Sequence, residues 1–203
     1  MYYCNVEPCF KMIVPIGVDC GMAEFLKKYN LRTSSFPFDW TVTYNGVSSC
    51  INDDFKFFTE PLDKRINKYD MYFHHDFIHP HLLSQDTEKY VRRYNRLLEI
   101  LRSGSEEVIF CRKGHASHLH KEHDGKYNHI TSDLDDAKNL DIVLQTKYPN
   151  LKYKIIVILV CGNCFNSAAT YTSDSNNIEI HNIASAQADD ARFNDLCRAI
   201  FKV

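Results

Sequence analysis

The sequence predicts an α/β fold, in which a single three-layer domain has a mostly parallel central sheet with helices on both faces. Three observations predict this architecture. The 203 residues suit one domain with a full hydrophobic core. Strand-like and helix-like segments alternate through the second half of the chain. The near-continuous apolar run at 153–160 is typical of a strand buried on both faces of a parallel sheet. We therefore expect one domain over residues 1–203.

Short apolar runs and the residues that interrupt them predict the elements of the first half. In chain order, we expect a strand at 12–16, a helix at 21–29, an ordered loop at 31–43, a short helix at 47–51 and a strand at 69–77. Gly17–Asp19 breaks the first strand, and Pro37 with several aromatic residues favours the loop. The aromatic density of 69–77 favours a strand, which Pro80 ends.

The second half shows the clearest periodicity. In chain order, we expect a helix at 86–102, a strand at 107–112, a helix at 133–148, a strand at 153–160, a strand at 177–183 and a closing helix at 189–201. Tyr90, Leu97 and Leu101 belong to one apolar stripe along the first of these helices. The polar, histidine-rich segment 113–129 is expected to be a long surface loop.

Composition limits the classes of function and the compartment. A net charge of −2 with mixed signs gives no argument for nucleic acid or an anionic membrane as a partner. No apolar run is long enough to span a membrane, and the first eleven residues lack the pattern of a secretory signal. The eight cysteines are scattered. We therefore expect an intracellular, cytoplasmic protein with reduced thiols and no cofactor.

Cys20 is the first candidate for chemistry, because it lies between the first strand and the first helix. Free backbone N–H groups and the positive end of the helix dipole favour a thiolate at such a turn. This placement suits a nucleophile or an anion site. The alternative is a small buried hydrophobic residue, which is the commonest role of a free cysteine.

Two histidines and two carboxylates could complete a site around this thiol. If 69–77 is a strand, His74 and His75 point to opposite sides, so only one of them can share a site with Cys20. A thiolate–imidazole pair oriented by an acid is the recurrent arrangement of cysteine nucleophiles. Asp76 or Asp39 could orient the ring. Alternatively, Asp39 bonds backbone amides inside an aromatic plug.

The remaining polar clusters are weaker candidates. Arg92, Arg93 and Arg96, together with Arg112, could bind an anion, or they could be solvated helix charges. His181 is a reserve candidate for a catalytic base at a strand end. Five histidines could hold zinc or nickel, but their irregular spacing favours a solvated loop: His115, His118, His120, His123 and His129. Cys161 and Cys164 are taken as structural, so no metal site is expected.

Several stretches together resemble a widespread uncharacterised family named after papain-like cysteine peptidases. The matching stretches are Ile16–Cys20 with Ala23 and Leu26, Asn30–Arg32, Phe36–Trp40, Asn52–Phe55, Phe73–Phe77, Glu88–Leu97 and Val108–Arg112. The resemblance is clearest over residues 12–113. It implies Cys20 as the nucleophile and His75 as the general base, with Asp76 or Asp39 orienting the ring.

Three functions remain open. The first is a cysteine-dependent hydrolase, as the resemblance implies, acting on a peptide or other acyl bond. The second is a glycosyltransferase-like or other enzyme that handles carbohydrates or nucleotide sugars. In either enzyme, the residues expected to bind the unknown peptide or carbohydrate substrate are Arg32, Trp40, Arg93 and Arg112. The third is a non-enzymatic binding module, in which Cys20 is buried and unreactive.

Overall fold

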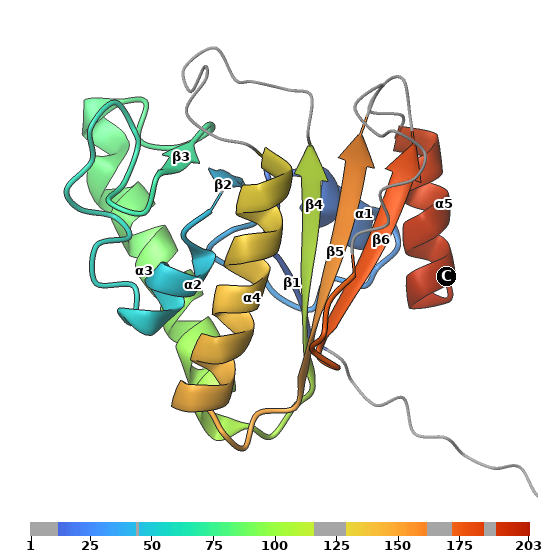
Figure 1. The fold of residues 1–203 in the computed structure, drawn as a ribbon. Helices are drawn as coiled ribbons and strands as arrows, with labels where there is room; N and C mark the ends of the chain where they lie inside the picture. Colours follow the sequence, from blue (N-terminus) through green and yellow to red (C-terminus); the bar gives the residue numbers. More distant parts are fainter. Residues whose placement is uncertain (1–11, 44, 116–128, 162–171, 185–189) are drawn as a thin grey trace, which may run out of the picture.

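The computed structural model describes residues 12–43, 45–115, 129–161, 172–184 and 190–203. Its central sheet has the strand order β1-β4-β5-β6, and all neighbouring strands are parallel (Figure 1). These strands are β1 (Met12–Pro15), β4 (Val108–His115), β5 (Tyr153–Cys161) and β6 (Ile178–Ala184). The predicted α/β class with a parallel central sheet is confirmed. Each of these strands matches an expected one to within a few residues.

A second, two-stranded sheet was not expected from the sequence. It pairs β2 (Thr41–Thr43) with β3 (Met71–Phe73) in antiparallel fashion. The end of the expected loop 31–43 is therefore a strand, and the expected strand 69–77 is wrong beyond Phe73. Phe73 pairs with Thr41, the first residue of β2, so the chain has no strand partner after this point.

The helices also follow the sequence pattern closely. They are α1 (Gly21–Lys28), α2 (Val47–Asn52), α3 (Leu83–Ser103), α4 (His129–Lys147) and α5 (Asp190–Phe201). A short 3₁₀ helix, η1 (Pro80–Leu82), directly precedes α3. The helix α3 therefore begins at Leu83 and not at the expected residue 86. Gly104 ends α3 in a left-handed conformation at φ +58°, the usual conformation for a residue that follows a helix.

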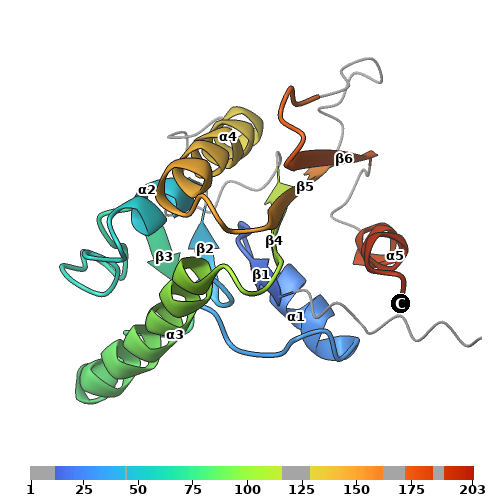
Figure 2. The same cartoon turned by 90° about the horizontal axis from the view of Figure 1, so that it is seen from below.

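The helices lie on both faces of the central sheet. Seen from below, α2, α3 and α4 lie on one side and α1 and α5 on the other (Figure 2). Alternate strand residues supply the two cores, as expected for strands buried on both faces. Val14, Phe110 and Ile155 belong to the first core, whereas Ile109 and Ile156 belong to the second. We call the second side the α1/α5 face.

Some expectations lie partly outside the described residues. In the histidine-rich segment, residues 113–115 belong to β4 instead of a loop, residue 129 begins α4, and residues 116–128 are outside the description. Of the cysteine pair at 161 and 164, the first ends β5 and the second lies outside. Among the described residues, no helix is long and apolar enough to cross a membrane.

Candidate active site

The carboxyl ends of the four parallel strands share one edge of the central sheet, which is the upper edge in Figure 1. Open α/β sheets bind their ligands in the crevice outside this edge. The turn that joins β1 to α1 begins there and carries Asp19 and Cys20. We therefore take this edge, called the carboxyl edge below, as the place of the candidate site.

Backbone contacts with β4 fix the first part of this turn. The Ile16 and Val18 N–H groups donate to the carbonyls of Cys111 at 2.9 Å and Lys113 at 3.1 Å. The chain therefore continues alongside β4 after β1 has ended. A Cβ atom at Gly17 would lie 3.0 Å from the Lys113 carbonyl oxygen. This close approach of two backbones favours glycine at position 17.

An ion pair fixes the second part of the turn. Asp19 Oδ1 accepts a hydrogen bond of 2.8 Å from the Gly21 N–H, and Asp19 Oδ2 lies 3.1 Å from Lys113 Nζ. Lys113 is buried, and its ammonium group also lies 4.7 Å from the centroid of the Phe193 ring. The Asp19–Lys113 pair thus ties the start of α1 to β4 and to α5, directly beside Cys20.

Cys20 differs from the other cysteines whose side chains are described. It is partly exposed, whereas Cys50, Cys111 and Cys197 are buried. Its thiol contacts Glu24 Oε1 at 3.5 Å. Burial, followed by the carboxylates of Glu24 and Asp19, raises the pKa of the Cys20 thiol to about 11. The expectation that the turn favours a thiolate is therefore wrong, because burial and the two neighbouring carboxylates outweigh the effect of the helix start. The role of Cys20 as a nucleophile remains a prediction.

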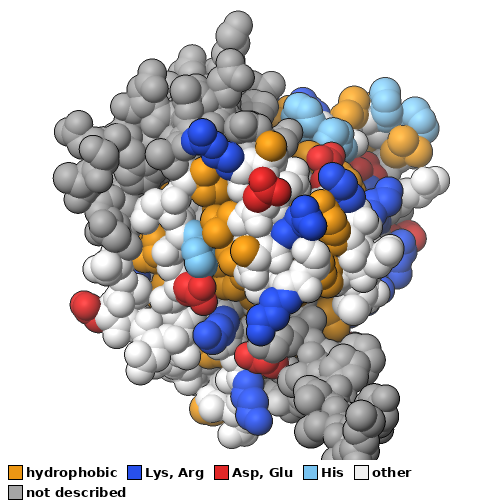
Figure 3. All heavy atoms as spheres, turned by 90° about the vertical axis from the view of Figure 1, so that its right-hand side faces the viewer, with side chains coloured by type: hydrophobic (Ala, Val, Ile, Leu, Met, Phe, Trp, Pro, Cys, Tyr) orange, Lys and Arg blue, Asp and Glu red, His pale blue; other side chains and the backbone are white. Residues whose placement is uncertain are grey.

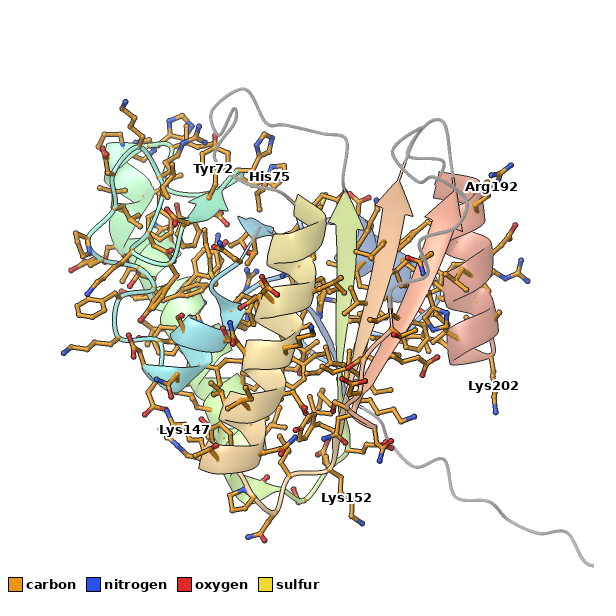
Figure 4. All side chains as sticks on the ribbon, viewed as in Figure 1. Tyr72, His75, Lys147, Lys152, Arg192 and Lys202 are labelled. Atoms are coloured by element: carbon orange, nitrogen blue, oxygen red, sulfur yellow. The ribbon has the colours of Figure 1, made fainter. Side chains whose placement is uncertain are left out.

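His74 and His75 lie in the turn after β3. Their rings are nearly perpendicular, with centroids 4.7 Å apart, so the expectation that they point to opposite sides of a strand is wrong. His75 is exposed, and its ring also packs edge-on against Trp40 at 6.0 Å. Figure 4 shows His75 and Tyr72 at the top of the molecule, toward the carboxyl edge.

A small apolar cluster of Val18, Val42 and Tyr72 joins the β1–α1 turn to the small sheet that precedes the histidines. The structure therefore brings the turn that carries Cys20 and the segment that carries His75 toward the same edge. The two side chains do not contact each other. Among the described residues, the thiol contacts Glu24, and the His75 ring contacts Trp40 and His74.

The two predicted orienting carboxylates have other partners. Asp39 is buried and accepts hydrogen bonds from Arg32 Nη2 and, at 3.2 Å, from the Phe36 N–H. Burial raises the pKa of Asp39, and Arg32 is the main opposing influence. Asp76 accepts hydrogen bonds from Lys89 Nζ and, at 2.7 Å, from Tyr90 Oη. Neither contact set includes a histidine, so neither acid orients the His75 ring in this structure.

Three of the predicted substrate-binding residues lie around Asp39. The Arg32 guanidinium lies 5.9 Å from the centroid of the Trp40 ring, and Arg93 influences the Asp39 carboxyl electrostatically. Arg32 Nε, Arg93 Nη1 and Asp39 Oδ1 are buried and have no hydrogen-bond partner among the described residues. Arg93 of α3 thus comes together with Arg32 and Trp40 of the segment between α1 and β2. Through Trp40 this cluster reaches His75.

Arg112, the fourth predicted substrate-binding residue, lies in the core. Its side chain is fully buried, and Nε pairs with Asp133. Nη1 and Nη2 donate to the carbonyls of Ile16 and Thr43, each at 3.0 Å. Each of the three guanidinium nitrogens therefore has a partner. The partners lie just after β1, at the end of β2 and in α4. Arg112 is therefore placed to hold the fold together, and its guanidinium group does not reach a substrate at the surface.

The reserve base His181 lies within β6, which continues to residue 184, and not after the strand. Its Nε2 contacts Glu179 Oε1 at 2.6 Å.

Two residues next to Cys20 were not predicted from the sequence: Lys113, which was expected in a loop, and Glu24. The four-residue spacing from Cys20 to Glu24 was the available signal for this contact, since such pairs share a helix face. Among the described residues, no group of three or more His, Cys, Asp or Glu side chains could hold a metal ion.

Residues 11–72 match the model of a family described as "Putative papain-like cysteine peptidase (DUF1796)". The family resemblance is confirmed over this segment. The segment contains Cys20, Arg32, Asp39 and Trp40, whereas His75 lies just beyond it. The chain is also 24% identical to "Uncharacterized protein R408" of Acanthamoeba polyphaga mimivirus, over 76% of this chain and 91% of that protein. No solved structure matches the chain.

Proposed function

We propose that this protein is a cysteine-dependent hydrolase that acts at the carboxyl edge, with Cys20 as nucleophile and His75 as general base. One observation carries the proposal. Cys20 is a partly exposed cysteine on the strand-to-helix turn at this edge, inside the segment that resembles the papain-like family. Cys50, Cys111 and Cys197, the other cysteines whose side chains are described, are buried in the cores and cannot meet a substrate.

The reaction starts from a protonated thiol, because the pKa of Cys20 is raised to about 11. As the sulfur attacks the acyl carbon, the His75 ring takes the thiol proton and then gives it to the leaving group. Water hydrolyses the resulting thioester, with His75 again as base, and restores the thiol. This scheme requires substrate binding to bring Cys20 and His75 within reach of each other, since catalytic contacts are often looser in free enzymes.

The start of α1 would stabilise the oxyanion. The Gly21 N–H already donates to Asp19. Met22 and Ala23, the next residues of the first turn, are buried, so the amide assigned to this role is the N–H of the partly exposed Cys20. Trp40 packs against His75, and Arg32 lies beside Trp40; these two residues and Arg93 are assigned to substrate binding. Their mixture of an aromatic ring and cations suits a peptide or a carbohydrate with acidic groups.

The charge at this turn favours the hydrolase over the nucleotide-sugar alternative. Phosphate groups bind at helix starts where N–H groups and cations face them. Here Asp19 and Glu24 place two carboxylates at the start of α1, and Lys113 offsets one of them. The non-enzymatic alternative predicts a buried Cys20, whereas this side chain is partly exposed.

The test is turnover of p-nitrophenyl acetate, an activated ester, with trapping of the acyl group on Cys20 by peptide mass spectrometry. We expect Cys20→Ala to abolish enzymatic turnover and His75→Ala to lower it by about 10²- to 10⁴-fold. Both variants should keep the circular dichroism spectrum and the melting temperature of the wild type. Lys152→Ala, an exposed residue at the opposite end of the sheet, is the matched control. Wild-type turnover in Cys20→Ala would refute the proposal.

A further inference from the structure

A groove lies on the α1/α5 face, near the amino ends of the strands and away from the carboxyl edge. Its volume is about 920 Å³. Sites for small molecules commonly enclose about 300–1,000 Å³. Its floor and walls are largely apolar and include Ile13, Ile109, Ile156, Leu31, Leu196 and Ile200. The first three come from the sheet, and the last two come from α5.

The groove lies between the sheet, the second half of α5 and the segment that follows α1. On the α1/α5 face, the apolar residues Ile156 of β5 and Ile183 of β6 belong to the core with α1 and α5. One step toward the amino end on the same face, the residues become polar: Lys154 on β5, then His181 and Glu179 on β6. An apolar floor thus adjoins a polar end within one groove.

The charged side chains that line the groove are two lysines and one glutamate, so the lining carries net positive charge. Lys154 and Lys202 both line the groove, and neither forms an ion pair with a described residue. Glu179 is the acidic residue among the lining side chains, and it pairs with His181 at 2.6 Å. Figure 4 shows Lys202 at the lower end of α5. On the side of the molecule that presents β6 and α5, hydrophobic side chains reach the surface next to Lys and Arg side chains (Figure 3).

We propose that this groove binds an amphipathic anion, and specifically a free fatty acid. The hydrocarbon chain would lie over Ile13, Ile109 and Ile156, which gains the free energy of apolar burial. The carboxylate would lie near Lys154 and Lys202 and form ion pairs with their ammonium groups. The neighbouring apolar surface would strengthen these ion pairs. The site is independent of Cys20 and of the hydrolase reaction proposed above.

Isothermal titration calorimetry with decanoate and with the uncharged 1-decanol tests the charge. We expect saturable 1:1 binding of decanoate to the full chain. The double substitution K154M/K202M should weaken decanoate binding at least about tenfold, since a hydrogen-bonded charge contributes about 1.5–3 kcal/mol. The same variant should bind 1-decanol like the wild type. Lys152→Met is the matched control, because Lys152 is exposed but does not line this groove.

A second variant tests the location. Ala199 is exposed on α5 and lines the groove, so Ala199→Trp should fill it without disturbing the core. We expect this variant to lose both ligands, whereas Ala191→Trp, at an exposed position on the same helix outside the groove, should keep both. Melting temperatures establish that each variant is folded. Absence of decanoate binding to the wild type, or binding that both K154M/K202M and Ala199→Trp leave unchanged, would overturn the proposal.

Discussion

Glu24 lies one helical turn after Cys20, and its carboxylate contacts the thiol at 3.5 Å. A carboxylate in this position stabilises the protonated thiol in two ways. It accepts a hydrogen bond from the S–H group, and its negative charge disfavours a second negative charge on sulfur. Burial remains the largest cause of the raised pKa, and Glu24 is the next. At the scale of single residues, Glu24 therefore keeps Cys20 unreactive until a base removes its proton.

Replacing Glu24 should make the thiol more reactive. Because Glu24→Gln removes the charge but retains a polar side chain, we expect the pKa of Cys20 to fall below about 11. A decrease of half a unit to one unit raises the thiolate fraction at pH 8 about three- to tenfold. The measurement is the rate of iodoacetamide alkylation of Cys20 between pH 7 and pH 11, followed by peptide mapping to separate it from the other cysteines.

The wild-type rate should keep rising up to about pH 11, where the thiol titrates. In Glu24→Gln the rise should level off at a lower pH. Glu99→Gln, at an exposed position of α3, is the control and should follow the wild-type profile. Identical profiles for Glu24→Gln and the wild type would show that the contact with Glu24 does not set the pKa of this thiol.

At the scale of elements, α2 depends on a residue that is distant in the sequence. Asp136 of α4 is buried and accepts hydrogen bonds from the N–H groups of Val47 and Ser48, each at 3.2 Å. It also accepts one of 2.6 Å from Ser48 Oγ. These N–H groups are at the start of α2, where Gly46 offers no side chain to cap them. Asp136 thus supplies the N-cap from another helix.

We expect Asp136→Ala to destabilise the protein by about 1–2 kcal/mol, the usual cost of losing an N-cap. The loss should be concentrated at α2, because the start of this short helix would keep unsatisfied N–H groups. Urea unfolding measures the global change, and hydrogen exchange at Val47 and Ser48 measures the local one. Asp135→Ala, at the exposed neighbouring position, should change neither quantity by more than about 0.5 kcal/mol. Unchanged exchange at α2 would contradict the capping role.

The sequence predicted the features that depend on neighbouring residues and missed those that depend on residues far apart in the chain. Regular hydrophobic periodicity reports burial within one element, and it predicted the four parallel strands and α3 correctly. The Asp136 cap joins residues 88 positions apart, and no local pattern records such a pair. The strand β2 was overlooked for a similar reason, since it has only three residues. Three residues are too few to establish a period of two.

The candidate site was predicted in part. The strand-to-helix turn at Cys20 followed from the sequence, because Gly17 interrupts an apolar strand and helical spacing follows. The ionisation of the thiol did not follow, since it depends on how far the thiol is buried and on where the Glu24 and Asp19 carboxylates lie. The role of Arg112 was also not visible. A charged residue at the end of a predicted strand normally faces water.

At the scale of the whole molecule, Arg112 connects the two sheets and α4. Among the described residues, Arg112 has the only guanidinium group that is fully buried. It donates hydrogen bonds to the carbonyls of Ile16, after β1, and Thr43, at the end of β2. Its ion pair with Asp133 extends the contact to α4. Because the turn that carries Cys20 starts directly after Ile16, this network also fixes the position of the backbone at the start of that turn.

Removing Arg112 should therefore destabilise the whole fold. Arg112→Met leaves the buried Asp133 carboxylate without its cation, and breaking such a pair typically costs about 3–5 kcal/mol. Urea unfolding at pH 7 measures this loss of unfolding free energy. The double variant R112M/D133L should recover part of it, because replacing both charges by apolar groups removes the uncompensated charge.

Arg102→Met is the matched control, since Arg102 pairs with Asp54 while its side chain is 57% exposed. We expect it to cost less than about 1 kcal/mol, as exposed ion pairs do. If Arg112→Met costs no more than Arg102→Met, the buried network does not hold the sheets together. If it costs as much as predicted, the rate of Cys20 alkylation in native conditions should also change, because the support beneath the β1–α1 turn has been removed.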